Sequence, residues 1–209
     1  DNFFTTTHPD EIKTVINRKK LEFLPILVDE NIENLDLYNQ ENKIKDLFFA
    51  LSHGVNFGKL KKGKTDEREK FLDQLMHKFP EIKYNILGHN YEEPKWNYDY
   101  FKELSKCKVA LNLSRGKPLK YTSSNRIASL IANGIYTFVD EKTRFKDYFS
   151  ENEMGFYKNI DDLGSKIEKV ISNPVRLKQF SRNGKNKYFK LFNNKLITKK
   201  MINKIFNYD

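Results

Sequence analysis

Along most of the chain, short continuous apolar segments alternate with segments in which apolar residues recur at helical spacing. A short apolar segment bounded by turn residues is typical of a strand buried on both faces of a parallel sheet. The expected strands are residues 47–51, 82–87, 109–113, 135–139 and 155–157. The expected helices are residues 66–78, 98–107, 124–134, 143–149 and 160–171. This alternation predicts an α/β domain with a doubly wound parallel sheet over residues 46–173.

The first part of the chain has a separate pattern. Residues 2–7 and 21–28 are strand-like and flank a helical segment at 9–18, so residues 1–28 are predicted to form one βαβ unit. The polar stretch at 29–45 is typical of a linker. Position 1 is Asp, and we therefore expect the sequence to begin inside a longer reading frame or after processing.

The last part, residues 174–209, is predicted to consist of basic helices that break near Gly184. Apolar rings repeated along a basic helix usually mark a packed face. Five rings are therefore expected to pack against the βαβ unit or the sheet: Phe180, Tyr188, Phe189, Phe192 and Phe206.

The composition narrows the classes of function without selecting one. A hydrophobic content of 38% excludes a disordered chain. A net charge of +10 suits a nucleic-acid binder, a membrane-surface protein or an enzyme with an anionic substrate. A composition biased toward Lys, Asn, Ile and Phe explains the charge equally well. No apolar run is long enough to cross a bilayer and no signal peptide opens the chain, so we expect a cytoplasmic protein.

Cysteine and histidine give no reason to expect a metal. The single cysteine, Cys107, excludes an internal disulfide and a multi-cysteine zinc site, and its place before a buried strand predicts a small core residue. The four histidines fall in separate segments without the spacing of metal ligands. We expect neither a structural metal nor a cofactor.

Two loops at the carboxyl ends of the expected strands are rich in cations. Ligands of open parallel sheets bind at these ends, where helices present their N-terminal N–H groups. The first loop combines flexible backbone with positive charge, which suits phosphate, although it has neither the P-loop pattern nor a dinucleotide glycine triplet and a solvated turn is the alternative. Its glycines and lysines are Gly54, Gly58, Gly63, Lys59, Lys61, Lys62 and Lys64.

The second cationic loop precedes the helix expected at 124–134. It brings four cations and several hydroxyl groups to one helix start, an arrangement that would hold a diphosphate by charge-assisted hydrogen bonds. The alternative is a capped helix in which Arg126 pairs with a carboxylate. The residues are Arg115, Lys117, Lys120, Tyr121, Thr122, Ser123, Ser124, Asn125 and Arg126.

Catalytic groups are not evident. The sequence has no nucleophile elbow and no helical pair of histidines around a glutamate. His53 and His89 both follow expected strands, where a hydrogen-bonded structural role is the alternative to a role in binding.

The segment 124–134 and the strand after it resemble the nucleotide-sugar-binding half of GT-B glycosyltransferases, and the likeness runs from about Asp46 to the end of the chain. The group 1 and spore-maturation-type families are the most similar. In these families an Arg, a Glu and a turn of small residues and Gly precede a buried strand. Arg126 and Gly134 fit this pattern, but Ser129 stands at the Glu position, which leaves the donor, and whether the chain binds a donor at all, open.

The resemblance implies a Rossmann-like domain that transfers a sugar from a nucleotide-activated donor, without a bound metal, in glycan or cell-surface polysaccharide synthesis. Residues 1–28 would then be the last piece of an acceptor-binding domain. The acceptor, whether glycan, lipid-linked or protein, is not specified, and a peripheral membrane contact is compatible with the charge. The donor-binding residues would be Gly54, Lys59, Lys62, His89, Arg115, Lys120, Ser123, Ser124, Asn125, Arg126 and Ser129.

Two other functions remain open on the sequence. The lysines and aromatic residues suit a nucleic-acid-binding module, and Ser129 suits a catalytically inactive scaffold. Cations gathered at the strand ends would favour the glycosyltransferase, whereas one continuous stripe along the C-terminal helices would favour nucleic acid or a membrane surface.

Overall fold

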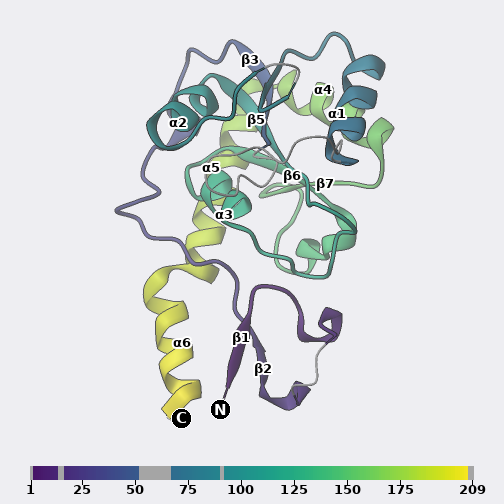
Figure 1. Ribbon diagram of the computed structural model, residues 1–209. Coiled ribbons are helices and arrows are strands. Elements are labelled where there is room, and N and C mark those ends of the chain that lie inside the picture. Colours follow the sequence, from purple (N-terminus) through teal and green to yellow (C-terminus); the bar gives the residue numbers. More distant parts are fainter. Residues whose placement is uncertain (1, 14–16, 52–66, 90–91, 207–209) are drawn as a thin grey trace.

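The computed structural model describes residues 2–13, 17–51, 67–89 and 92–206, with Arg18 described by its backbone alone. Five parallel strands form one sheet in the order β4-β3-β5-β6-β7, which confirms the expected doubly wound α/β fold (Figure 1). The order reverses at β3, since the chain passes to β4 on one side of it and then to β5 on the other. The strands are β3 Lys45–Ala50, β4 Tyr84–Leu87, β5 Cys107–Asn112, β6 Tyr136–Asp140 and β7 Gly155–Tyr157.

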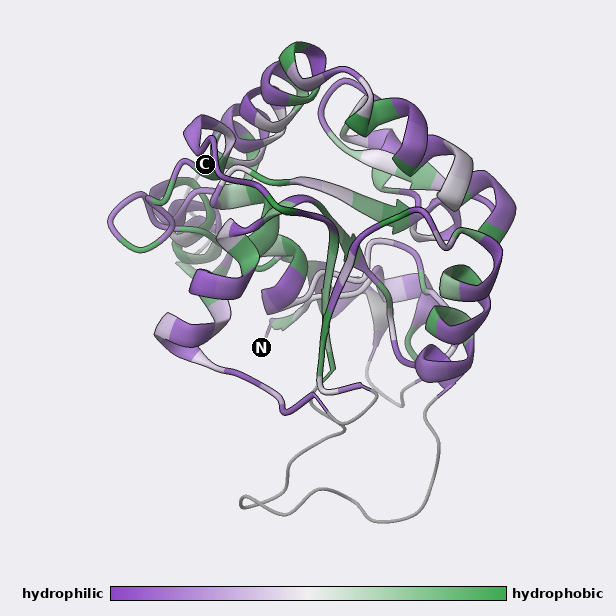
Figure 2. Ribbon diagram, turned by 90° about the horizontal axis from the view of Figure 1, so that it is seen from above, coloured by the Kyte–Doolittle hydropathy of each residue, from purple (hydrophilic) through white to green (hydrophobic). Residues whose placement is uncertain are grey.

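Helices cover both faces of this sheet. Successive side chains of a strand point to opposite faces, so Leu47 and Phe49 of β3 pack under α1 (Glu67–Lys78) and α4 (Ile160–Ile171). Phe48 packs on the other face under α2 (Asn97–Ser105) and α3 (Asn125–Ala132). Figure 2 shows the hydrophobic strands at the centre and the helices around them.

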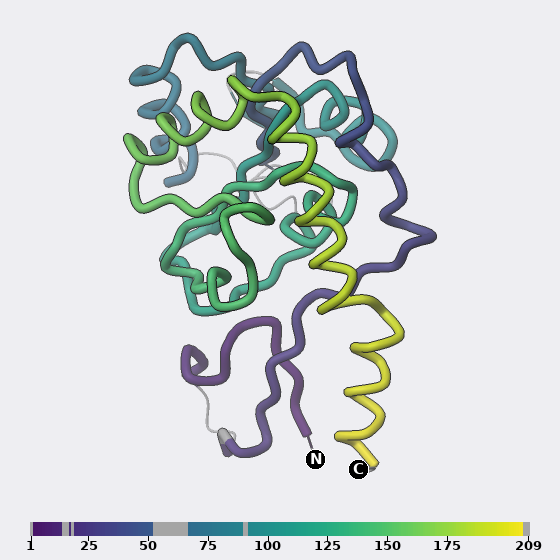
Figure 3. The backbone as a smooth tube through the Cα atoms, turned by 180° about the vertical axis from the view of Figure 1, so that it is seen from behind, coloured from purple at the N-terminus to yellow at the C-terminus, as the bar shows by residue number. Residues whose placement is uncertain are grey.

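The C-terminal segment forms two helices, and the break expected near Gly184 is wrong. Helix α5 (Pro174–Phe192) continues through Gly184, and α6 (Asn194–Phe206) follows after Asn193 (Figure 3). Gly184 is buried, and a Cβ atom there would lie 2.2 Å from the Glu153 backbone oxygen. This glycine therefore permits close packing of a helix instead of ending it.

Four of the five expected rings pack as predicted. Tyr188 and Phe192 are buried, and Phe180 and Phe189 are partly buried against the same hydrophobic clusters. The expectation for Phe206 is wrong, because this side chain is 61% exposed near the end of α6. Helix α6 extends past the sheet and lies beside the N-terminal strands (Figures 1 and 3).

The N-terminal segment contains two short parallel strands, β1 (Phe3–Thr5) and β2 (Leu21–Phe23). The helix expected at 9–18 is wrong for the described residues: one 3-10 turn covers Pro9–Glu11, Ile12 is already extended, and a separate 3-10 turn, Arg18–Lys20, begins at the end of this range. The helix expected at 143–149 is likewise two 3-10 turns, Glu141–Thr143 and Phe145–Asp147, because Arg144 between them has a left-handed backbone with φ of 60°.

The segment 29–45 is not simply solvated chain. Leu37 begins a 3-10 turn and is fully buried beside Phe48 and Leu130. Asp36 forms an ion pair with Lys185 of α5 at 2.8 Å, which ties this segment to the C-terminal helix. The domain boundaries given by the sequence analysis stay a prediction.

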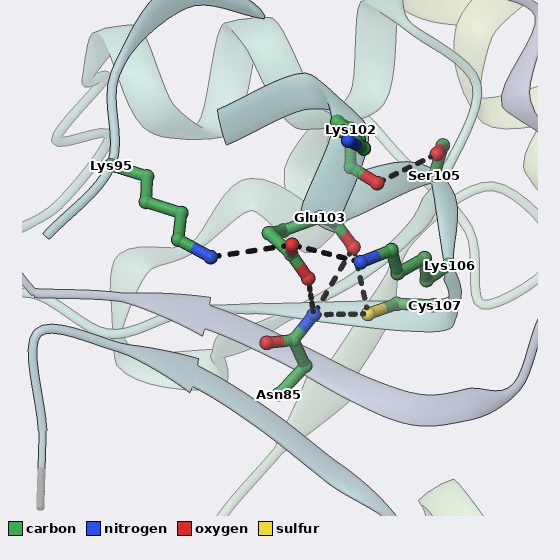
Figure 4. A network of polar contacts seen from close by, with 7 residues as sticks. All are labelled: Asn85, Lys95, Lys102, Glu103, Ser105, Lys106 and Cys107. Atoms are coloured by element: carbon green, nitrogen blue, oxygen red, sulfur yellow. Dashed lines mark hydrogen bonds and ion pairs between the residues drawn. The ribbon is translucent and has the colours of Figure 1, made fainter. Parts of the chain in front are cut away.

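A polar network fixes the end of α2 against β4 and β5 (Figure 4). Glu103 accepts hydrogen bonds from Lys106 at 2.8 Å and from Asn85 at 3.2 Å, and Lys95 lies 3.3 Å away. Burial would raise the pKa of Glu103, but these hydrogen bonds outweigh it and lower the pKa to about 2. Cys107 is fully buried beside this network, as expected of a core residue.

Candidate functional site

The candidate site lies at the carboxyl ends of the strands, beside the neighbouring strands β3 and β5. In a doubly wound sheet, ligands bind in the crevice at the point where the strand order reverses, and here that point is between β3 and β5. The chain leaves β5 at Asn112 and reaches α3 at Asn125, so the second cationic loop borders this point. The sequence analysis located the loop correctly.

Of the two serines before α3 that could cap it, Ser123 and Ser124, the structure shows that Ser124 is the cap. Its backbone is extended, and its Oγ accepts a hydrogen bond from the Ile127 N–H at 3.3 Å. The same Oγ lies 3.4 Å from Asn112 Oδ1 at the end of β5, which fixes the helix start beside the strand end. The partial positive charge of a helix N-terminus favours an anion at this position.

Arg126 stands in the first turn of α3 and is half-buried. Its Nη1 donates to the Leu113 backbone oxygen at 3.1 Å, and its guanidinium carbon lies 4.8 Å from the centre of the Phe49 ring. Both contacts come from strand ends, β5 and β3, and so Arg126 joins the two strands at which the order reverses. A guanidinium group presents paired N–H donors that match the oxygens of phosphate and carboxylate groups.

Ser123 has a structural role that the sequence analysis did not predict. It is buried, its Oγ accepts from the Ile26 N–H at 2.9 Å, and its own N–H donates to the Thr6 oxygen at 2.7 Å. Lys120 is also tied to the N-terminal segment, through its backbone oxygen, which accepts from the His8 N–H at 3.0 Å. These contacts anchor the second cationic loop to β1, β2 and their connections.

Three of the remaining predicted residues, Arg115, Asn125 and Ser129, lie in the described part of the chain. Arg115 and Asn125 are exposed, one in the loop and one at the start of α3. Ser129 is half-buried one turn further along α3, and its backbone oxygen accepts from the Asn133 side chain at 2.9 Å. Gly54, Lys59 and Lys62 lie outside the described residues, as does His53.

His89 lies at the end of β4 and is held between two carboxylates of α1. Its Nε2 is 2.8 Å from Asp73 Oδ1, and its Nδ1 is 4.0 Å from Glu69 Oε1. The side chain is buried, which agrees with the structural alternative for this histidine. The sequence analysis missed the two carboxylates, although Glu69 and Asp73 stand four residues apart on a predicted helix and therefore share a face.

Tyr121 was a member of the predicted loop without an assigned role. It has a left-handed backbone with φ of 55°, and its hydroxyl donates to Asp147 Oδ2 at 2.7 Å. This hydrogen bond and burial raise the pKa of Tyr121 to about 12. The ring contacts His8 and Tyr148 at centroid distances of 5.4 and 5.0 Å, so Tyr121 holds the loop against both neighbouring segments.

The described residues give this edge the means to bind an anion. A capped helix N-terminus, the Arg126 guanidinium and exposed cations of the loop lie along it. Among the described residues, no three His, Cys, Asp or Glu side chains are grouped closely enough to hold a metal ion. None of the described helices is sufficiently long and apolar to span a membrane.

Solved structures show the same fold. Sucrose-phosphate synthase from Thermosynechococcus elongatus aligns with a TM-score of 0.60 at 10% identity, over 91% of this chain and 54% of that one. Anabaena Alr3699/HepE in complex with UDP and glucose aligns with a TM-score of 0.61 at 10% identity, over 90% and 57% of the two chains. The crystal structure of TarM aligns with a TM-score of 0.57 at 12% identity, over 79% and 36%. This chain therefore spans little more than half of the first two proteins.

Sequence comparison gives the family. No curated protein matches the chain significantly. The family model described as glycosyl transferase-like matches residues 65–203, from the start of α1 into α6. The match covers more than half of the chain, including the second cationic loop, α3 and most of the C-terminal helices. We conclude that this chain belongs to the glycosyl transferase-like family.

Proposed function

We propose that this chain is the donor-binding part of a glycosyltransferase, and that the diphosphate of a nucleotide sugar binds at the start of α3. The observation that carries the proposal is the position of Arg126. It contacts the ends of β3 and β5 at the point where the strand order reverses, beside a helix N-terminus capped by Ser124. A group with two or more negative charges is stabilised where guanidinium and helix N–H donors converge.

The proposal assigns different roles to the predicted residues. Arg126 and the first turn of α3 bind the diphosphate, with Asn125 and Arg115 at the exposed side. Lys59 or Lys62 of the first loop contributes further charge. Ser123, Lys120 and Tyr121 position the loop through their contacts with the N-terminal segment. His89 positions α1 relative to β4 through Asp73.

The proposal also covers the donor, the cellular location and the pathway class. The Anabaena protein HepE has been crystallised with UDP and with UDP-glucose, so UDP sugars are the first donors to test. We propose metal-independent transfer in the cytoplasm, within glycan or cell-surface polysaccharide synthesis, and a place near the spore-maturation-type subgroup. The family match does not favour the nucleic-acid or scaffold alternative.

A thermal-shift panel tests this proposal. The full chain is heated with UDP-glucose, other nucleotide sugars, bare nucleoside diphosphates, the matching monophosphates and a single-stranded oligonucleotide. A ligand that binds only the folded state raises the melting temperature as its concentration exceeds its dissociation constant. We expect at least one nucleotide sugar or diphosphate to stabilise the chain more than the matching monophosphate. Stabilisation by the oligonucleotide alone would contradict the proposal.

A further inference from the structure

The structure contains a cavity at the amino ends of the strands, opposite the candidate donor site. Its volume is about 370 Å³, which is within the range of small-molecule sites. Tyr136 and Gly155, the first residues of β6 and β7, form part of its wall. Because all strands of the sheet are parallel, their amino ends lie across the sheet from the carboxyl ends that Arg126 contacts. The two sites are therefore separate.

The floor of this cavity is aromatic. Tyr136 and Phe138 of β6 are buried, and Phe180 of α5 is half-buried. The ring of Tyr136 lies 5.3 Å from that of Phe138 and 5.7 Å from that of Phe180, measured between centroids. Gly155 allows the Phe138 ring to lie against the β7 backbone, since a Cβ atom there would be 2.4 Å from that ring. Such a floor suits a flat apolar group.

The rim of the cavity is cationic. Three cations line it, Lys166, Lys169 and Arg176, against one carboxylate, Glu151. Lys166 is already engaged, because its Nζ donates to the Phe156 oxygen at 2.7 Å and lies 3.2 Å from Asp162. Within the described ranges, no carboxylate lies within ion-pair distance of Lys169 or Arg176. The rim therefore carries positive charge that the protein itself does not neutralise.

Side-chain contacts hold the cavity wall beside the cationic rim in place. The Arg176 guanidinium carbon lies 4.9 Å from the centre of the Phe180 ring, and so the charge stands directly above the apolar floor. The Tyr136 hydroxyl donates to the Glu151 backbone oxygen at 2.6 Å, which holds the facing loop in place. A ligand that enters would meet a preformed apolar surface and a cation next to it.

We propose that this cavity is a second binding site, for a small organic anion in which a flat apolar ring carries a carboxylate or phosphate. The ring lies on Tyr136, Phe138 and Phe180, and the anionic group faces Lys169 and Arg176. Neither the sugar donor nor its diphosphate is required at this site. The inference depends on the cavity alone and holds whether or not the chain transfers sugar.

The test is an NMR titration of the full isotope-labelled chain with 2-naphthoate and with the neutral 2-naphthalenemethanol. We expect 2-naphthoate to shift the amide signals of Gly155, Phe156 and Val170, and to bind about tenfold more tightly than the neutral compound, the effect of one charge-assisted hydrogen bond. Three results would each overturn the proposal. They are signal shifts confined to α6 or to α3, equal affinity for the two compounds, and no binding of 2-naphthoate.

Matched variants test whether Lys169 and Arg176 bind the anionic group of the ligand. Arg176→Gln and Lys169→Gln should each weaken binding of 2-naphthoate severalfold while leaving that of 2-naphthalenemethanol unchanged. Phe206→Ser removes an exposed ring of α6 and serves as the control for nonspecific apolar binding, with no expected effect. A loss in Phe206→Ser equal to that in Arg176→Gln would also overturn the proposal. Retained signal dispersion in each variant shows that it is folded.

Discussion

Replacing Glu103 by Gln should destabilise the protein in a pH-dependent way. The Glu103 side chain is 16% exposed and is held by Lys106, Asn85 and Lys95 (Figure 4). Burial acts to raise its pKa, but the hydrogen bonds dominate and lower it from 4.5 to about 2. A shift of this size corresponds to at most about 3 kcal/mol of stability. Because Lys95 and Lys106 are 36% and 35% exposed, solvent screening reduces the expected contribution to about 1–2 kcal/mol.

The sign follows from the direction of the shift. A pKa that is lower in the folded state stabilises the protein above the unfolded pKa, and this contribution is lost as pH falls from 4.5 toward about 2. Urea denaturation of the wild type and Glu103→Gln should therefore differ most near neutral pH and converge in acid. Glu81→Gln, at an exposed position, is the matched control with little effect. A difference between wild type and Glu103→Gln that is unchanged across this pH range would refute the reasoning.

Three further predictions concern stability and reactivity. Ser124→Ala removes the α3 cap and should cost about 1 kcal/mol in urea denaturation, and an unchanged midpoint would contradict the assigned cap. Gly184→Ala should destabilise by about 1–3 kcal/mol through overpacking against Glu153, whereas Asn186→Ala, exposed on the same helix, should not. Burial raises the pKa of Cys107 to about 12, so its thiol should resist a disulfide reagent in the folded protein and react once unfolded; rapid reaction in the native state would show that this pKa is wrong.

The sequence could predict the sheet and α3 because their signals are local. Short apolar strands, a serine before α3 and a glycine after it are visible without any knowledge of distant contacts. Ser124 accepts from Ile127 and Gly134 has φ of 82°, as such positions require. The position of the second cationic loop followed from strand order, which parallel α/β patterns restrict strongly.

The sequence could not predict features that depend on distant contacts or on an unusual backbone conformation. From the sequence, Gly184 is a plausible helix break, but the structure shows that it makes room for the Glu153 backbone oxygen. Ser123 resembles a ligand contact until its hydroxyl is found bonded to the Ile26 N–H. The helix expected at 143–149 fails at Arg144, whose left-handed backbone is uncommon for a residue other than glycine. The partners of Gly184 and Ser123 are far away in sequence, and so no local pattern could reveal them.

The most direct test of the proposed function is a calorimetric titration of Arg126→Ala and Arg182→Ala with the nucleotide that stabilises the wild type best, at two salt concentrations. Both variants lose one positive charge, but Arg126 borders the candidate donor site, whereas Arg182 is exposed on α5 and lines neither proposed site. Loss of a charge-assisted hydrogen bond costs roughly 1.5–3 kcal/mol, so Arg126→Ala should bind about tenfold to a hundredfold more weakly and keep that deficit at high salt. Arg182→Ala should bind nearly as the wild type does. Equal losses in both variants that disappear together at high salt would show that only net charge matters, and would contradict a diphosphate site at the start of α3.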